Sequence, residues 1–477
     1  MTLYGVNFNI VCMTIYIPGE LNPRTPKYKA IADAIERDIF SGRLQPGTQL
    51  PPHRELADAL AINVSTVTRA YGEARSRGLL SGTVGRGTFV AADADTDTCL
   101  VPLEPHAPGM VEMGLVAPLY AQDPDAGAEL ARLSRGNQFN RFFKYTSPAG
   151  LAEHQRAGVI WARRYGMVAP AENIVVTAGA QHALTCALIS LFTRGDRVAV
   201  EALSYPALKA LAQMLGIGLT PVEMDDQGMV PQALDRVCRR DAVQGVFLMP
   251  SCQNPTTACM DAERREEMAR VIARHRLLLL EDDTYALTRP ELAPEAPKNF
   301  PISARIPDHA LFIAAISKAF LPGLRTAFVV VPRQLRKPFT QAVLNTIWMA
   351  PTLNAALAAA WITNGTAERV IQAKQAEARR RRDRVLSRLQ DGGLDKTSGP
   401  KVQGHGGSFF LWLTLPRGMD SHQLELAARK EGLNIFCAQR FAVGSDPVPQ
   451  ALRLSLTGPE SLEELDRGMD ILTRLLG

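Results

Sequence analysis

The chain has 477 residues, of which 46% are hydrophobic and 21% are charged. This composition is typical of globular proteins and excludes a disordered or fibrous chain. Because a single hydrophobic core stops growing at about 250–300 residues, the length predicts one large domain and one smaller domain. The formal net charge of +5 is small for this length, so it is compatible with a nucleic-acid partner but does not indicate one.

The cysteines and the hydropathy pattern exclude further classes. The seven cysteines are scattered without a paired CxxC spacing, which predicts reduced thiols and no metal site. No apolar run reaches the roughly 20 residues of a membrane-spanning helix, and the apolar stretch 10–17 lacks a basic leader. We therefore expect a cytoplasmic protein that does not bind membranes. Residues 1–25 are interpreted as an extension, with Met13 as an alternative start.

Residues 26–90 have the pattern of a small helical domain. Apolar residues at helical spacing predict three helices, over residues 28–39, 56–60 and 64–77. Asn63 stands at the N-cap of the third helix and Gly78 at its C-terminal cap, and residues 79–90 are predicted to form two short strands. The pattern alone also fits a generic helical subdomain.

The residues of this segment are more specific than its periodicity. The stretches LQPGTQLPPHRELADAL, NVSTVTRAY and RGLLSGTVGRGTFV closely resemble the winged helix-turn-helix of the GntR family of transcription regulators. The resemblance implies that the third helix lies in the major groove of a double-stranded DNA operator. The residues it implies at the DNA are Ser65, Thr66, Thr68 and Arg69 on this helix, Arg54 on the preceding helix and Arg86 in the wing. Val64 occupies a position that is basic in many members, which predicts that other bases are read.

Residues 91–109 are predicted to be a linker. The stretch 91–98 is small, acidic and without periodicity, and three prolines follow within a few residues of one another. Such a tether leaves the DNA-binding domain free to take several positions relative to the rest of the chain.

Residues 110–477 alternate apolar strand-like runs with helical stretches. The runs are NIVVTAG, RVAVEAL, GVFLMP, LLLLEDD, LFIAAIS and TAFVVV. Near-continuous apolar runs are expected of strands covered on both faces, so we predict an α/β fold with a mainly parallel sheet and helices on each side. In such sheets, ligands bind outside the carboxyl ends of the strands.

Polar residues cluster at those ends. Gly179 follows the first run and precedes a helix whose N-terminus can hold a phosphate. The polar residues that follow later runs are Asn254, Asp282, Asp283, Tyr285, Lys318 and Arg325. Each alone is ordinary at a strand end. Together they offer what a carbonyl cofactor needs: an amine for a Schiff base, a carboxylate for a pyridine nitrogen, donors to a phenolate and a phosphate cradle.

The order and spacing of these residues, above all the stretches SKAFLPGLR and EDDTY, resemble the class I aminotransferases of pyridoxal-phosphate fold type I. The resemblance covers the large domain and implies a small C-terminal α/β subdomain. It implies pyridoxal 5′-phosphate as the cofactor, with Lys318 forming the internal aldimine and Asp282 pairing with the pyridinium nitrogen. Tyr285 and Asn254 would hydrogen-bond the phenolate oxygen, and Tyr205 would stack on the ring.

The same resemblance implies the remaining ligand contacts. The phosphate site is assigned to Gly179, Ala180, Gln181 and Arg325. Tyr145 would reach the phosphate of the other subunit of a homodimer. Arg453 would clamp the carboxylate of a substrate or effector, although a surface arginine at a strand edge is the alternative interpretation.

Three features depart from the family or stand outside it. Ala315 and Ala178 occupy positions that commonly carry a hydroxyl at the phosphate, which predicts a weaker phosphate site. The loop 437–441 lacks the Pro-Gly pair common in relatives. The basic cluster 379–382 lies in a strongly helical stretch and is interpreted as a solvated face.

The combination of a GntR-type DNA-binding domain with this aminotransferase-like domain resembles the MocR subfamily, whose members sense pyridoxal phosphate or its adducts with amino compounds. The first hypothesis is therefore a regulator that binds DNA, pyridoxal phosphate and a small amino-compound effector. The alternatives are an active aminotransferase with an accessory DNA-binding domain, and a DNA-binding scaffold whose large domain only dimerises.

Overall fold

The computed structural model describes residues 16–19, 21–23, 25–40, 43–44, 48–76, 79–83, 87–90, 109–288, 300–391, 400–444 and 447–477. They fall into two compact units that divide between Thr96 and Asp97. Residues 91–108 of the predicted linker 91–109, the first fifteen residues, the predicted helix cap Gly78 and Arg86 lie outside the described residues.

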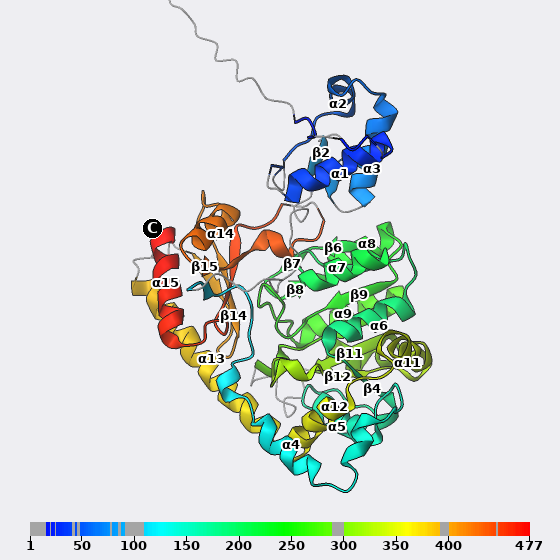
Figure 1. Cartoon of the computed structure of the whole chain (residues 1–477), viewed down its shortest axis with the longest axis vertical. Coiled ribbons are helices and arrows are strands. Elements are labelled where there is room, and N and C mark those ends of the chain that lie inside the picture. The colour runs from blue at the N-terminus through cyan, green and yellow to red at the C-terminus, as the bar shows by residue number, and fades with distance from the viewer. Residues whose placement is uncertain are drawn as a thin grey trace, which may run out of the picture. The chain divides into compact units, whose positions relative to one another are not determined.

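The N-terminal unit is a three-helix domain with a hairpin (Figure 1). Its elements are α1 (Lys27–Phe40), α2 (His53–Ala59), α3 (Val64–Ser76), β1 (Leu80–Thr83) and β2 (Gly87–Val90). The two strands pair antiparallel, as expected of a wing. The apolar residues predicted at helical spacing, among them Ile35, Leu56 and Val67, form its core. This confirms the predicted order of helices and hairpin.

Capping explains where α3 begins. The side-chain oxygen of Asn63 accepts hydrogen bonds from the backbone nitrogen and the hydroxyl of Ser65, both at 2.9 Å. This satisfies a donor that the first turn of a helix leaves without an intrahelical partner. Part of the predicted extension also belongs to this unit, because Tyr16 donates a 2.8 Å hydrogen bond to Asp38 of α1.

The large unit is built on a seven-stranded sheet in the order β4-β12-β11-β10-β9-β5-β6 (Figure 1). Its strands are β4 (Ile174–Thr177), β5 (Arg197–Glu201), β6 (Gly218–Val222), β9 (Gly245–Leu248), β10 (Leu278–Asp282), β11 (Ala310–Ala315) and β12 (Ala327–Val330). All six predicted runs are strands. Only β12 runs opposite to the other six strands, so the sheet is mainly parallel, as expected. A short hairpin, β7 (Met224–Asp225) and β8 (Gly228–Met229), lies outside it.

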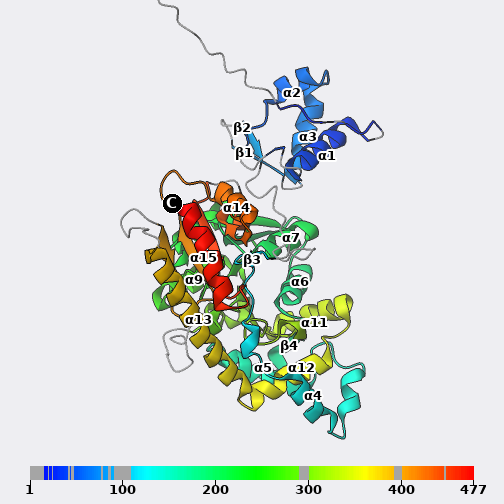
Figure 2. The same ribbon diagram turned by 60° about the vertical axis from the view of Figure 1, so that its left-hand side comes forward.

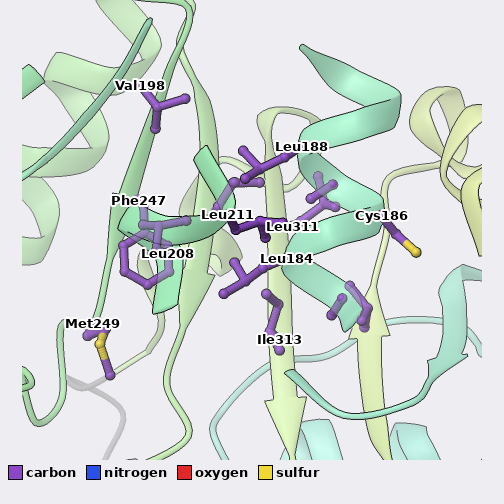
Figure 3. Close-up of a cluster of buried hydrophobic side chains, with 14 of the residues drawn as sticks. Leu184, Cys186, Leu188, Val198, Leu208, Leu211, Phe247, Met249, Leu311 and Ile313 are labelled. Atoms are coloured by element: carbon purple, nitrogen blue, oxygen red, sulfur yellow. The ribbon is translucent and has the colours of Figure 1, made fainter. Parts of the chain in front are cut away.

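Helices cover both faces of this sheet, which explains its apolar strands. One face packs against α6 (Ala180–Leu191), α7 (Pro206–Leu215) and α11 (Arg333–Ile347). Figure 3 shows Leu184 and Leu188 of α6 beside Leu311 and Ile313 of β11. The helices packed on the opposite face are α5 (Ala152–Arg163), α8 (Pro231–Arg240), α9 (Ala262–His275) and α12 (Thr352–Thr363). Two shorter helices are α4 (Ala126–Ser134) and α10 (Ile302–Arg305).

The C-terminal subdomain is a four-stranded antiparallel sheet with helices. Its strands are β13 (Lys401–Gln403), β14 (Phe410–Thr414), β17 (Ala451–Ser455) and β16 (Phe436–Cys437), and its helices are α13 (Thr366–Asp391), α14 (Ser421–Lys430) and α15 (Leu462–Leu476). Helices α13 and α15 run side by side in both views (Figure 1 and Figure 2). The first strand of the large unit, β3 (Val111–Glu112), pairs in parallel with β15 (Leu433–Asn434) of this subdomain.

One expectation for α13 is wrong. The cluster 379–382 is not a uniformly solvated face, because Arg381 is buried and donates hydrogen bonds to the carbonyl oxygens of Leu456 and Pro459. Arg381 therefore fastens α13 to the segment that leads into α15. Arg380 keeps its side chain in solvent. Within the described ranges, no helix has the length and apolar character needed to cross a bilayer.

Candidate functional site

The predicted polar residues meet at one edge of the large sheet. Strands β9, β10 and β11 are parallel neighbours, so the residues that follow them emerge at the same edge. Asp282 ends β10, Asn254 lies in the turn after β9, and Lys318 follows β11 by three residues. Arg453 reaches this edge from β17 of the C-terminal subdomain and contacts Asn254.

Lys318 presents an amine that is held by the backbone. Its Nζ donates a 2.6 Å hydrogen bond to the carbonyl oxygen of Val116 and lies 5.6 Å from the centre of the Tyr285 ring. Burial lowers the pKa of Lys318 to about 8, and the positive charges of Arg453, Lys374 and Arg325 act in the same direction. A lowered pKa leaves more of the amine in its neutral, nucleophilic form near pH 7.

Asp282 is a buried carboxylate beside this amine. It accepts hydrogen bonds from the backbone nitrogen of Thr284, at 3.2 Å, and from the Thr284 hydroxyl. Burial nevertheless raises the pKa of Asp282 to about 6. Among the described residues no cation forms an ion pair with it. A protonated pyridine nitrogen would provide the missing positive charge. Thr284 was not predicted, although a threonine two residues after an aspartate is a common local donor.

Arg453 is not a surface residue, so the alternative interpretation is wrong. Its side chain is 1% exposed, because β17 lies between β14 and β16. Nη1 donates a 2.6 Å hydrogen bond to Oδ1 of Asn254, and Nη2 donates a 2.5 Å hydrogen bond to the carbonyl oxygen of Gly114. Its Nε finds no acceptor within the described part of the chain. Burial lowers the pKa of Arg453 to about 10.

Three aromatic rings that were not predicted surround the Arg453 guanidinium. Phe410, Phe436 and Phe441 have their ring centres 4.8–5.6 Å from its Cζ. Aromatic faces attract a cation and also keep water away from it. The site therefore holds a desolvated cation whose remaining N–H donors, that of Nε among them, suit an anionic ligand such as a carboxylate.

The predicted phosphate residues lie together at the start of α6. Gly179 has a φ of +86°, and a Cβ added there would lie 2.6 Å from Nη2 of Arg325. Arg325 therefore lies directly over the backbone that begins the helix, where free amides attract anions. Gln181, in the first turn, has a buried Oε1 without a partner among the described residues. Ala178 and Ala315 add no hydroxyl here.

The three predicted tyrosines differ in their surroundings. Tyr285 is buried and packs edge-to-face on Phe410, with ring centres 5.1 Å apart. Tyr205 is partly buried, and burial together with the nearby charge of Asp282 raises its pKa to about 12. Tyr145 lies on the surface, 81% exposed, with its ring 5.3 Å from that of Trp348. Its predicted role toward a second subunit stays a prediction.

The predicted DNA face lies on α2 and α3. Arg54, Ser65, Thr68 and Arg69 are exposed, and Thr66 is partly exposed. The Arg69 guanidinium stacks on the Tyr28 ring at 4.2 Å. Thr68 donates to the carbonyl oxygen of Val64 and lies 3.0 Å from Nδ1 of His53, a residue that sequence reasoning did not single out.

Comparisons with known proteins find matches for both the N-terminal unit and the large unit. The aminotransferase class I and II family model matches residues 110–471, and the model for bacterial regulatory proteins of the gntR family matches residues 27–90. An uncharacterized HTH-type transcriptional regulator of Bacillus subtilis, YdeF, is 34% identical over 94% of each chain. The chain is a GntR-family transcriptional regulator with an aminotransferase class I and II domain.

Other relatives of this regulator have assigned roles. The HTH-type transcriptional regulator TauR of Rhodobacter capsulatus is 28% identical over 90% of this chain and 93% of its own. The vitamin B6 salvage pathway transcriptional repressor PtsJ of Salmonella typhimurium is 30% identical over 63% of this chain and 66% of its own. Among solved structures, an archaeal alanine:glyoxylate aminotransferase has a TM-score of 0.72 at 21% identity and covers 85% of this chain and 98% of its own. That likeness shows the fold of the large unit.

Proposed function

We propose that this regulator binds pyridoxal 5′-phosphate at Lys318, and that an amino-compound effector at the same site changes its affinity for an operator. The observation that carries the proposal is the grouping of a partly buried amine, a buried carboxylate and a buried guanidinium in a chain that also has a winged helix-turn-helix. The regulator would act in the cytoplasm, where its DNA lies.

The residues at the site fit pyridoxal phosphate. When bound, the cofactor supplies a carbonyl carbon that condenses with primary amines. Asp282 would keep a proton on the pyridine nitrogen, which would offset the cost of burying its own charge. The Asn254 amide and the Tyr285 hydroxyl would donate to the phenolate, and Tyr205 would cover the ring.

The phosphate would be held mainly by the backbone. The amides of Gly179, Ala180 and Gln181 begin α6, and Arg325 lies 2.6 Å from where a Cβ of residue 179 would stand. Without hydroxyls at positions 178 and 315, Arg325 would carry a larger share of the binding. The predicted contact from Tyr145 of a second subunit would complete the site, which is why we propose a homodimer.

The effector would be a small molecule with an amine and a carboxylate. The amine would react at the cofactor, and the carboxylate would take a bidentate position on Arg453. Arg453 already donates to Asn254 and Gly114, so a carboxylate would compete with these two acceptors as well as engage Nε. Binding of the effector would therefore rearrange protein contacts around Arg453.

Operator titrations test this proposal. Sequencing the DNA bound by the purified protein supplies the operator. Its affinity is then measured with and without pyridoxal phosphate and candidate amines, for the wild type and for Lys318→Ala. We expect a change of about 5–150-fold on addition of the effector, which is the range of typical allosteric couplings. Lys318→Ala should keep basal DNA binding and lose the response that depends on the covalent link. Unchanged affinity and footprint throughout would contradict the proposal.

Catalytic transamination is the second candidate function. Lys318, Asp282 and Arg453 together provide the reactive amine, the ring partner and the carboxylate clamp that such catalysis requires. Incubation of the loaded protein with amino donors and keto acids, with Lys318→Ala as the control, measures it directly. Turnover together with an unchanged operator affinity would favour the enzyme.

A further inference from the structure

The segment 114–123, here named the strap, lies against the cofactor site. It follows β3, the first strand of the large unit, and in sequence it stands shortly after the predicted linker. Four side chains from separate parts of the fold donate hydrogen bonds to carbonyl oxygens of the strap. They are Arg453 to Gly114, Lys318 to Val116, Thr457 to Ala117 and Lys374 to Pro118.

These four donors divide into two groups. Arg453 and Lys318 are the two residues that the proposed cofactor and effector would engage. Thr457 and Lys374 stand outside the proposed ligand contacts, and Lys374 also reaches Asp123 at the far end of the strap, at 2.5 Å. Lys374 is therefore the residue that bonds to the strap at two places without being part of the ligand site.

Lys374 is an unusual residue for its position. It lies on α13 with a fully buried side chain, and its partner Asp123 is 5% exposed. Burial lowers the pKa of Lys374 and raises the pKa of Asp123, so each charge depends on the other. Buried ion pairs add little net stability, but removing one partner is costly. We therefore interpret the Lys374–Asp123 pair as a contact that fixes the position of the strap.

We propose that Lys374 is a positioning residue for Lys318. Through Pro118 and Asp123 it anchors the strap, and the strap holds the Lys318 amine by the carbonyl of Val116. The inference rests on the proposed function, because it concerns the amine that would capture the cofactor. Condensation with the cofactor aldehyde would turn this amine into an imine and release two of its hydrogens in water, which would weaken the bond to Val116 and leave the strap held mainly by Arg453, Thr457 and Lys374.

Lys374 also acts on Lys318 through its charge. The charged groups that act on the amine are Arg453, Lys374 and Arg325 as cations and Asp282 as an anion. A neighbouring cation disfavours protonation, so removal of the Lys374 charge raises the pKa of Lys318. The neutral amine is the form that attacks a carbonyl. Without Lys374, capture of pyridoxal phosphate should therefore need a higher pH.

The test compares Lys374→Met with the wild type by two measurements. Hydrogen exchange of the amides of residues 115–117 is measured first, in the cofactor-free protein. The pH dependence of the rate of pyridoxal phosphate capture is then followed by absorbance. We expect exchange about tenfold faster, which corresponds to loss of about one hydrogen-bonded anchor. We also expect capture at pH 7 to slow by about threefold, which is the effect of raising the pKa by half a unit.

Lys209→Met is the matched control. Lys209 is also a buried lysine that donates to a backbone carbonyl, at 2.6 Å from Ala442, but it does not bond to the strap. Lys209→Met should leave the hydrogen exchange of the strap amides and the pH dependence of pyridoxal phosphate capture unchanged. Lys374→Arg keeps a buried cation and should restore at least part of both properties. If Lys374→Met does not fold, Asp123→Asn serves for the exchange measurement and should also accelerate it.

The outcomes separate this inference from the proposed function. If wild-type protein fails to capture pyridoxal phosphate, the proposed function is wrong, while exchange in the cofactor-free protein still tests the anchoring. Exchange of the strap at the wild-type rate in Lys374→Met, or equal acceleration in Lys209→Met, overturns the role of Lys374. An unshifted pH profile overturns its action on Lys318.

Discussion

Arg453 and Asn254 are joined by a 2.6 Å hydrogen bond from Nη1 to Oδ1. A guanidinium can only donate, so the acceptor must be the oxygen of the amide. The NH₂ group of Asn254 is then left to donate elsewhere, as binding to a phenolate requires. Through this one bond, Arg453, which is expected to contact the effector, orients Asn254, which is expected to contact the cofactor.

Asn254→Asp tests this orientation. The carboxylate keeps an acceptor for Arg453 but removes the donor and places a negative charge opposite the phenolate. We expect pyridoxal phosphate to bind at least about tenfold more weakly, with thermal stability near that of the wild type. Absorbance titrations measure the affinity. Asn254→Ala, which also leaves Arg453 without this partner, should be less stable than Asn254→Asp. Wild-type affinity in Asn254→Asp would refute the assigned role.

Gly179→Ala should weaken the phosphate site. The new methyl group would lie 2.6 Å from Arg325 and would displace it, and the backbone φ of +86° disfavours any side chain by about 1–3 kcal/mol. Gly195→Ala is the control, because its φ is +98° and no atom lies within 4 Å of the added Cβ. Both variants should lose similar stability. Only Gly179→Ala should bind pyridoxal phosphate more weakly, by about tenfold or more, and equal affinities would remove Arg325 from the phosphate.

The capture of pyridoxal phosphate should depend on pH in a defined way. Because burial lowers the pKa of Lys318 to about 8, the neutral amine accumulates as the pH rises through 8. An exposed lysine would titrate near 10.4. We expect the rate of capture to rise from pH 6 to 9 with a midpoint near 8, and a blocked lysine peptide to show no midpoint in this range. A midpoint near 10 would mean that the amine is solvated in solution.

Arg54 provides a test of the DNA face. It is exposed on α2 and is expected to contact a phosphate. Arg54→Ala should weaken operator binding and reduce the dependence of log affinity on log salt by about one unit. Arg54→Lys retains the charge and should keep the slope. Fluorescence anisotropy at several salt concentrations gives both values. Identical slopes for the alanine variant and the wild type would place Arg54 outside the interface.

Ser65 and Thr66 should affect sequence preference more than salt dependence. They lie in the first turn of α3, and the Ser65 hydroxyl is turned toward Asn63 as a donor. Alanine at position 65 or 66 should therefore change which bases are preferred, by about 1–3 kcal/mol for a lost base contact. Selection of bound DNA from a random pool measures the preference. Selection of the same motif by both variants would argue against base contacts from this turn.

Local patterns predicted six of the seven strands of the large sheet and its mainly parallel character, but not β6 and not the reversed direction of β12. The run TAFVVV reads as a buried strand, and β12 is one, yet it is antiparallel to β11 and β4. An apolar run reports that both faces are covered and carries no information about direction. Direction depends on the length of the connection, which is short between β11 and β12 and leaves no room for a crossover helix.

The burial of charged side chains was the least predictable feature. Arg453 lies in an alternating stretch that also fits an exposed strand edge, and the rings around it come from three separate segments. Arg381 and Lys374 stand in a helix rich in arginine, and each is buried by a segment far away in sequence. The residues at the strand ends were predictable because residues that follow parallel strands lie at the same edge of the sheet. The contacts that bury Arg453, Arg381 and Lys374 join distant parts of the sequence and become visible only in the folded structure.

Trp348 gives the protein a natural optical reporter. It is one of four tryptophans, and its side chain is 56% exposed, whereas the other three are at most 4% exposed. The red-shifted part of the intrinsic emission should therefore come mainly from Trp348, beside Tyr145. If a second chain covers this surface, dilution should shift the emission to longer wavelength as the indole regains contact with water. The self-association of the unlabelled protein can thus be followed at concentrations too low for scattering methods.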